Sequence, residues 1–261
     1  MIGAADLSEG LARLGLGAPA LAVAALVVLV SGMLRGLTGF GFAIAAVPLL
    51  STVLSPRLAV AVAALLQLAV GFANAPRAWK LADRASLAPL LVGAVIGTPL
   101  GMAALRLAPV GPQRLAVAAA ALLALVAAWR GPRLETSIVG RRPAAAGVAS
   151  GLLNGLAAMP GPPVVAHFLN APIEPAAARA SLTLYFAATA VFATASGLAA
   201  GIIDARAAAL AVICAPLLFA GDWLGGRLFR AGGERLFRPA AVAVLAAAAG
   251  IAAARGLADV L

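Results

Sequence analysis

The feature that most constrains the fold is a series of apolar blocks separated by short turns and charged residues. Most blocks run to roughly 16 to 25 residues, close to the ~20 that a helix needs to cross ~30 Å of hydrocarbon. They lack the alternation of polar and apolar residues that is typical of strands in an outer-membrane barrel. The pattern therefore predicts an all-α, polytopic integral membrane protein.

Composition supports this class and excludes several others. Hydrophobic residues make up 64% of the chain and charged residues 11%, with a mean hydropathy of +1.06, which excludes a soluble domain. The net charge of +10 comes from cations scattered over connecting loops, so we interpret it as membrane-flanking charge and expect no nucleic-acid partner. One cysteine and one histidine are too few for a disulfide framework or a metal centre. We expect no catalytic site, metal or cofactor.

The blocks divide into two sets of five, with a polar, arginine-rich linker between them. The expected domains are a tail at 1–17, transmembrane repeat 1 at 18–129, a cytoplasmic linker at 130–143 and transmembrane repeat 2 at 144–261. The individual blocks are expected near 18–34, 43–54, 58–75, 86–105, 114–129, 144–157, 163–170, 176–200, 206–226 and 236–254.

An internal duplication is visible in the residues themselves. The run from Ser31 to Leu37 (SGMLRGL) recurs 119 positions later from Ser150 to Leu156 (SGLLNGL), identical at five of seven positions. Further matches follow in the same order, with an offset that drifts to 125. They pair Pro56 with Pro175, Asp83 with Asp204, Gly97-x-x-x-Gly101 with Gly221-x-x-x-Gly225, and Arg130-Gly131 with Arg255-Gly256. An ordered series of this kind indicates two repeats.

The relative orientation of the repeats depends on how residues 18–54 cross the membrane. One broken helix would give four crossings in each repeat, whereas a hairpin or re-entrant pair would give an odd number. The second count places most of the 19 Arg and Lys residues on one side, as the positive-inside rule prefers. We therefore expect inverted repeats, with both termini outside and the short pieces ending near the membrane midplane.

Each repeat contains one glycine- or proline-rich gap within an apolar segment. The gaps lie at 35–42 (RGLTGFGF) and 154–163 (NGLAAMPGPP). Broken helices at corresponding places in inverted repeats mark the substrate site of many transporters, and helix N-termini at such breaks favour anions. The alternative is a helix kink with close glycine packing.

Polar residues in or beside the apolar blocks are candidate ligands, each with a structural alternative. Arg35 is either an anion contact or an interfacial anchor, and the same choice holds for Arg179. His167 is either a proton relay or cargo ligand, or a structural imidazole. Neutral groups such as Gln67 can serve a solute or join helices. Asp222 is the one carboxylate well inside an apolar block, and it either has a function or pairs locally near Arg227.

These motifs, taken together, resemble the sulfite exporter TauE/SafE family. The resemblance is carried by Gly36 to Phe42 leading to Pro48-Leu49-Leu50, by Gly151 to Gly155 with Pro160 to Pro163, and by Arg179 to Leu182 followed by Tyr185-Phe186. It covers nearly the whole chain. One departure is Ala157-Ala158, where a polar, glycine-bearing pair is expected, so the second gap should contact cargo less through its backbone.

The resemblance implies a permease for small sulfur-containing anions, such as sulfite or organosulfonates, in the bacterial inner membrane. The expected partners are this anion and membrane lipid, and the sequence leaves open whether the protein forms a homodimer. A transporter of another solute or ion, or an accessory subunit without its own cargo, is the alternative function. The substrate-binding candidates are Arg35, Thr38, Gly39, Phe40, Gly41, Gln67, Asn154, Pro160, Gly161, Pro162, His167 and Arg179.

Overall fold

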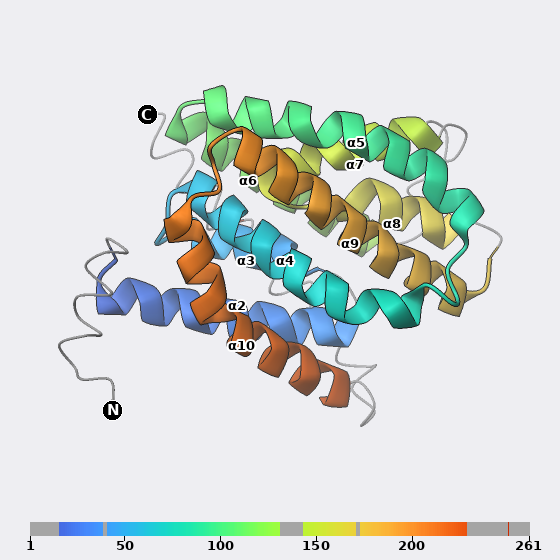
Figure 1. Ribbon diagram of the computed structural model, residues 1–261, viewed down its shortest axis with the longest axis horizontal. Helices are drawn as coiled ribbons and strands as arrows, with labels where there is room; N and C mark the ends of the chain where they lie inside the picture. The colour runs from blue at the N-terminus through green and yellow to red at the C-terminus, as the bar shows by residue number, and fades with distance from the viewer. Residues whose placement is uncertain (1–15, 39–40, 131–142, 171–172, 229–249, 251–261) are drawn as a thin grey trace.

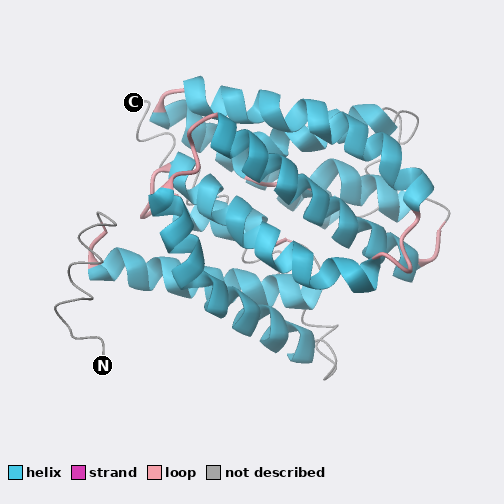
Figure 2. Ribbon diagram, viewed as in Figure 1, coloured by secondary structure: helices cyan, strands magenta, loops and turns pink. Residues whose placement is uncertain are grey.

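The computed structural model describes residues 16–38, 41–130, 143–170, 173–228 and 250. This part of the chain is built from helices joined by short loops and contains no strand (Figure 2), which confirms the all-α prediction. The helices are α2 (Ala18–Thr38), α3 (Phe42–Leu50), α4 (Pro56–Ala78), α5 (Arg84–Leu107), α6 (Val110–Arg130), α7 (Pro143–Ala157), α8 (Gly161–Asn170), α9 (Pro175–Ala199) and α10 (Ala205–Leu228).

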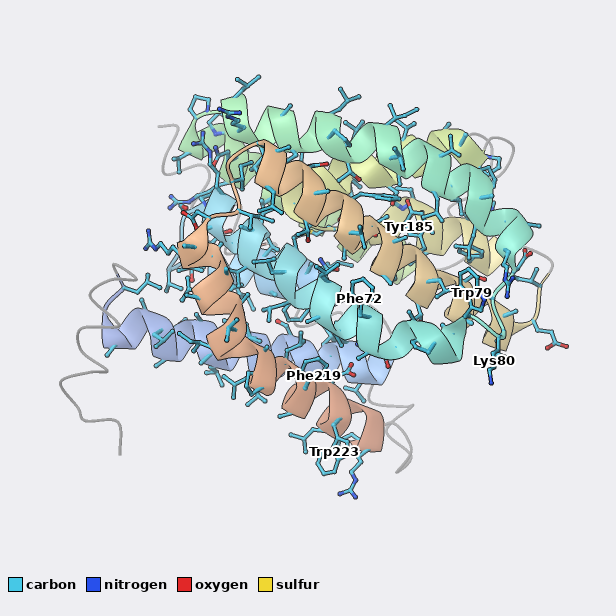
Figure 3. All side chains as sticks on the ribbon, in the orientation of Figure 1. Phe72, Trp79, Lys80, Tyr185, Phe219 and Trp223 are labelled. Atoms are coloured by element: carbon cyan, nitrogen blue, oxygen red, sulfur yellow. The ribbon has the colours of Figure 1, made fainter. Side chains whose placement is uncertain are left out.

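The surface of the helical assembly is suited to lipid. Within the described residues, α2, α4, α5, α9 and α10 each contain a stretch long and apolar enough to cross a membrane. Large apolar side chains cover their outer faces, and Phe72, for example, is 64% exposed. Figure 3 shows Phe72, Phe219 and Trp223 on this outer surface. The protein is therefore a multi-pass membrane protein.

Tryptophan and arginine pairs mark helix ends on this surface. The Arg84 guanidinium lies 4.4 Å from the centre of the Trp79 ring, and that of Arg227 lies 4.1 Å from the Trp223 ring. Both tryptophans are exposed. Amphipathic rings with a neighbouring cation are typical of the boundary between hydrocarbon and headgroups.

The long helices are arranged around a central pair. Helices α4 and α9 pack together in the middle, with the α5·α7 pair on one side and the α2·α10 pair on the other (Figure 1). The short helix α3 lies inside and is buried over nearly its whole length. Each outer pair joins a helix of one repeat to a helix of the other.

Glycines allow the helices of each outer pair to approach closely. A Cβ atom built on Gly97 of α5 would lie 2.9 Å from the Leu152 nitrogen of α7, and closer still to the Val148 carbonyl oxygen. On α10, a Cβ on Gly221 would lie 2.9 Å from the Met33 nitrogen of α2 and closer to the Leu29 carbonyl oxygen. Contacts of this kind to backbone atoms leave no room for a side chain.

Several contacts of the two outer interfaces are equivalent. Leu29 and Met33, which face Gly221, lie 119 positions before Val148 and Leu152, which face Gly97. In the same way Gly36 of α2 meets Asp222 and Gly226, and Gly155 of α7 meets Thr98 and Met102. The duplication seen in the sequence is thus present in the packing.

The repeats are inverted. In Figure 1, α4 runs from left to right and its equivalent α9 from right to left, and α5 and α10 are likewise opposed. The glycine contacts show that α2 is parallel to α10 and α7 is parallel to α5, so α2 and α7 are opposed as well. The short α3 and α8 turn back after α2 and α7, as the re-entrant count predicts.

Equivalent capping residues begin the helices of the two repeats. Asp83 precedes α5, and its carboxylate accepts the Ala85 N–H at 3.1 Å. Asp204 precedes α10 and accepts the Ala207 N–H at 2.7 Å. The Ser86 hydroxyl donates to Asp83, and this hydrogen bond is the main cause that lowers the pKa of the carboxyl group. The match of Asp83 with Asp204 in the sequence therefore reflects a shared N-cap.

The gaps are narrower than the sequence predicts. Helix α2 continues to Thr38 and α7 to Ala157, so Arg35 and Asn154 lie within helices rather than in gaps. The reason is that Gly36 and Gly155, which favour a break by propensity, are held helical by close packing against α10 and α5. The block expected at 236–254 lies almost wholly outside the described residues.

Replacing a glycine of an outer interface should destabilise the protein. We expect Gly97→Ala to lower stability by about 1–3 kcal/mol, because the added methyl group meets backbone rather than a movable side chain. Thermal unfolding in detergent measures the effect. Gly161→Ala is the matched control, since a Cβ there would meet Ile44 at an ordinary 3.5 Å. Equal melting temperatures for the two variants would contradict the role of the interface.

The inverted arrangement can be tested by labelling in a Cys214→Ala background. The loop before α5 and the loop before α10 are equivalent, so inverted repeats place them on opposite sides of the membrane. We expect Lys80→Cys and Arg206→Cys, both at exposed positions, to react with a membrane-impermeant maleimide from opposite sides. Labelling of both from one side would indicate parallel repeats.

Candidate functional site

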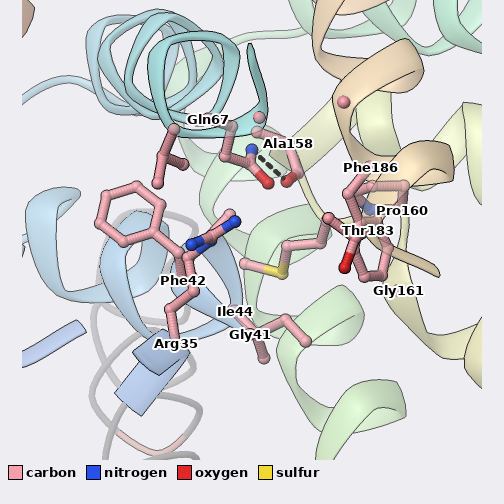
Figure 4. A pocket seen from close by; sticks show the side chains of 15 residues that line it. Arg35, Gly41, Phe42, Ile44, Gln67, Ala158, Pro160, Gly161, Thr183 and Phe186 are labelled. Carbon is pink, nitrogen blue, oxygen red and sulfur yellow. Dashed lines mark hydrogen bonds between the residues drawn. The ribbon is translucent and has the colours of Figure 1, made fainter. Parts of the chain in front are cut away.

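A small cavity of about 30 Å³ lies where the two gaps meet. It is bounded by the first turns of α3 and α8, the end of α7 and the facing sides of α4 and α9, with one side chain from α2 (Figure 4). Its lining residues are Arg35, Gly41, Phe42, Ala43, Ile44, Gln67, Val70, Gly71, Ala158, Met159, Pro160, Gly161, Thr183, Phe186 and Ala187.

The first gap ends at Gly41, which precedes α3. Gly41 has φ 97°, a left-handed conformation that glycine adopts without strain. The three residues that follow it, Phe42 to Ile44, form the first turn of α3 and line the cavity. First-turn N–H groups have no acceptor within their own helix, and they carry the positive end of the helix dipole. The start of α3 therefore favours negative charge in the cavity.

Hydrogen bonds satisfy backbone groups in the second gap. The Ala158 N–H donates to the Asn154 carbonyl at 2.7 Å and the Met159 N–H to the Leu153 carbonyl at 3.3 Å, which terminates α7. Ala158 has φ 53°, a region that glycine prefers, at the position where the family resemblance led us to expect glycine. Gln67 of α4 donates to the Ala158 carbonyl at 3.1 Å (Figure 4). The Ala158 carbonyl oxygen therefore has a hydrogen-bond partner within the protein.

A chain of hydroxyl groups also supports the second gap. Tyr185 of α9 donates its O–H to Ser150 at 2.9 Å, and Ser150 donates to the Pro160 carbonyl. All three groups are buried. Because Pro160 lines the cavity and directly precedes α8, this chain sets where the first turn of α8 begins.

Arg35 supplies a positive charge at the cavity. It projects from the last turn of α2, and in Figure 4 its guanidinium group lies between Phe42 and Gln67. Its Nη1 also donates to Oδ1 of Asp222 on α10 at 2.7 Å. The two side chains are 11% and 24% exposed, so the ion pair is largely shielded from solvent. Asp222 thus pairs across the helix interface with Arg35.

Asn154 occupies the position in repeat 2 that Arg35 occupies in repeat 1. Its amide group donates to Thr98 Oγ1 of α5 at 3.3 Å and to the Thr189 carbonyl of α9 at 2.8 Å. Its side chain is buried, and it is not among the residues that line the cavity. Asn154 therefore joins three helices beside the site.

The other predicted residues are distributed as follows. Gly41, Gln67, Pro160 and Gly161 line the cavity together with Arg35. His167 lies further along α8, edge-on to Phe168 at 5.3 Å between ring centres, and is not among the lining residues. Gly39 and Phe40 lie outside the described residues, as do the side chains of Thr38, Pro162 and Arg179.

Helix α9 contributes lining residues that are absent from the predicted set of substrate-binding residues. Thr183, Phe186 and Ala187 all face the cavity. Phe186 lies 119 positions after Gln67, so the repeat offset pointed to it. Gly71 of α4 was also missed, and it brings α4 close to α9, because a Cβ there would lie 3.0 Å from the Ala187 Cα.

One of the comparisons with known proteins gives an assignment. No curated protein and no solved structure is detectably similar to the chain. A protein-family model described as sulfite exporter TauE/SafE matches residues 24–252, which spans both repeats and both gaps. The resemblance noted in the motifs is thereby confirmed, and the chain belongs to the sulfite exporter TauE/SafE family of membrane transporters.

Proposed function

We propose that this protein is a secondary transporter in the bacterial inner membrane that moves small anions, sulfite or organosulfonates, by alternating access. The observation that carries the proposal is the convergence of three positive features on one cavity. The first turns of α3 and α8 and the Arg35 guanidinium all border it.

The chemistry of the cavity fits an oxyanion. The first turn of α3 offers N–H donors from one side. Helix α8 begins Gly161-Pro162-Pro163 and contributes the Gly161 N–H, because proline has no N–H. The Arg35 guanidinium offers a planar fork that matches a pair of oxygens. The remaining lining groups are mostly apolar, among them Phe42, Met159 and Phe186. Removal of water by such groups strengthens charge-assisted hydrogen bonds. A sulfite or sulfonate group presents three oxygens to this set of donors.

The size and position of the cavity fit alternating access. Its ~30 Å³ volume has room for about one or two waters, so a sulfonate enters only when the helices around it move apart. The cavity lies between elements of opposed repeats, which is where inverted-repeat transporters hold their substrate. The closely packed α2·α10 and α5·α7 pairs would move as rigid units on either side of α4 and α9.

Anion binding is the first test of this proposal. Sulfite or sulfoacetate should raise the melting temperature of the purified protein, since a ligand at about a hundred times its Kd stabilises by about 2.7 kcal/mol. Acetate, chloride and the sodium cation serve as controls. No shift with any sulfur anion, at concentrations up to tens of millimolar, would count against the proposal.

Filling the cavity should abolish this shift. We expect Gly161→Leu to remove stabilisation by sulfite or sulfoacetate, because a Cβ at this position already lies 3.5 Å from Ile44 and 4.0 Å from Phe186. The melting temperature without ligand checks that the variant is folded, because a leucine side chain exceeds the cavity volume of about 30 Å³ and must displace Ile44 or Phe186. Gly161→Ala, which adds only one methyl group, should retain most of the response. A full response in Gly161→Leu would place the anion elsewhere.

A further inference from the structure

The two outer interfaces differ at one equivalent pair of polar residues. At the α2·α10 interface Arg35 bonds Asp222 at 2.7 Å, and at the α5·α7 interface Asn154 bonds Thr98 at 3.3 Å. The pairs are equivalent because Gly36 faces Asp222 and Gly226, whereas Gly155 faces Thr98 and Met102. Repeat 1 therefore holds an ion pair where repeat 2 holds a neutral hydrogen bond.

The neutral pair shows that the interface does not require charge. The glycine contacts that flank the two polar pairs are equivalent at both interfaces. An ion pair shielded from water brings a desolvation penalty that a neutral pair avoids. The packing of α2 against α10 therefore does not require the charges of Arg35 and Asp222. Arg35 also borders the cavity.

An anion at Arg35 would lie beside the Asp222 carboxylate, which already accepts a hydrogen bond from the same guanidinium group. Two negative groups beside one cation repel each other strongly where water is scarce. A proton on the Asp222 carboxylate removes that repulsion and breaks the ion pair, which frees Arg35 for the anion. We propose that Asp222 takes up a proton from solvent when an anion binds at Arg35, so that proton and anion are transported together. This inference rests on the proposed function.

Within the part of the chain that the structure describes, Arg35 is the charged side chain that bonds Asp222. Helix α10 packs against α2 and α4. In α2 the ionisable residue is Arg35, and α4 carries Arg57 and Arg77 near its two ends with none between them. Within α10, Arg206 lies at the opposite end and Arg227 stacks on Trp223. The Asp222 side chain is 24% exposed and lies beside Trp223 near the end of α10, where the Trp223–Arg227 pair is typical of the boundary with the headgroups.

Charge balance supports the coupling. Of the four acidic residues in the described part of the chain, Asp222 is the one inside a candidate membrane-crossing segment. The empty site is neutral because the ion pair cancels. In the loaded site the proton offsets one negative charge of the anion. For an anion with one negative charge, both states can then change conformation without carrying an uncompensated charge through the membrane.

Proton uptake on binding provides the test. Sulfoacetate is fully ionised near neutral pH, so it neither gains nor loses a proton itself. We add it to purified protein in weak buffer with an indicator dye and follow binding in parallel by thermal shift. The native protein should take up about one proton per bound anion, and its affinity should increase as the pH falls.

Two variants separate coupling from structure. Asp222→Asn should bind sulfoacetate with an affinity that does not change with pH and without proton uptake. The double variant Arg35→Asn with Asp222→Thr installs the pair of repeat 2, and it should fold with near-native stability but lose anion binding. Its near-native melting temperature would confirm that the charges are dispensable for packing.

The outcomes distinguish this inference from the proposed function. Binding by the native protein without proton uptake, or equal uptake by native protein and Asp222→Asn, would overturn the coupling and leave anion transport intact. Absence of binding by sulfoacetate, sulfite and the other sulfur anions would overturn both. Unchanged anion binding in the double variant would show that Arg35 is not the ligand.

Discussion

The rest of the structure depends on the close approach of backbones at two helix interfaces. Between α5 and α7, and between α2 and α10, glycines let the main chains touch where any side chain would clash. In a bilayer the hydrophobic effect does not drive helices together, so packing of this kind provides specificity. Because each interface joins one repeat to the other, the two halves of the chain form a single assembly.

The broken helices follow from this assembly. Non-helical backbone at membrane depth must be satisfied by protein, water or cargo. The second gap is satisfied by Gln67 and by the Tyr185 and Ser150 hydroxyl groups, and the first turns of α3 and α8 remain directed at a shared cavity. The packed helices thus hold the non-helical backbone that precedes α8 beside the cavity.

The two repeats are alike in packing and different in charge. Equivalent glycines make equivalent contacts, and the asymmetry is concentrated where Arg35 and Asp222 replace a neutral pair. A transporter with inverted repeats needs similar halves so that its two open states have similar energies. Differences at Arg35–Asp222 and at Gln67, whose equivalent is Phe186, change the chemistry of the site, while the packing of the scaffold remains similar.

The sequence alone determined the class, the repeats, their inversion and the family. The length of the apolar blocks, the charge bias of the loops and the ordered series of matches can all be seen in the sequence without knowledge of the tertiary contacts. It also located Gly41, Gln67, Pro160 and Gly161 near the gaps. Only the tertiary structure decided that α2 and α7 remain helical through Arg35 and Asn154, because packing against α10 and α5 overrides the low helix propensity of glycine. The tertiary structure also decided that Arg35 pairs with Asp222. Asp222 lies 187 positions away, and the α2·α10 interface brings the two charges together.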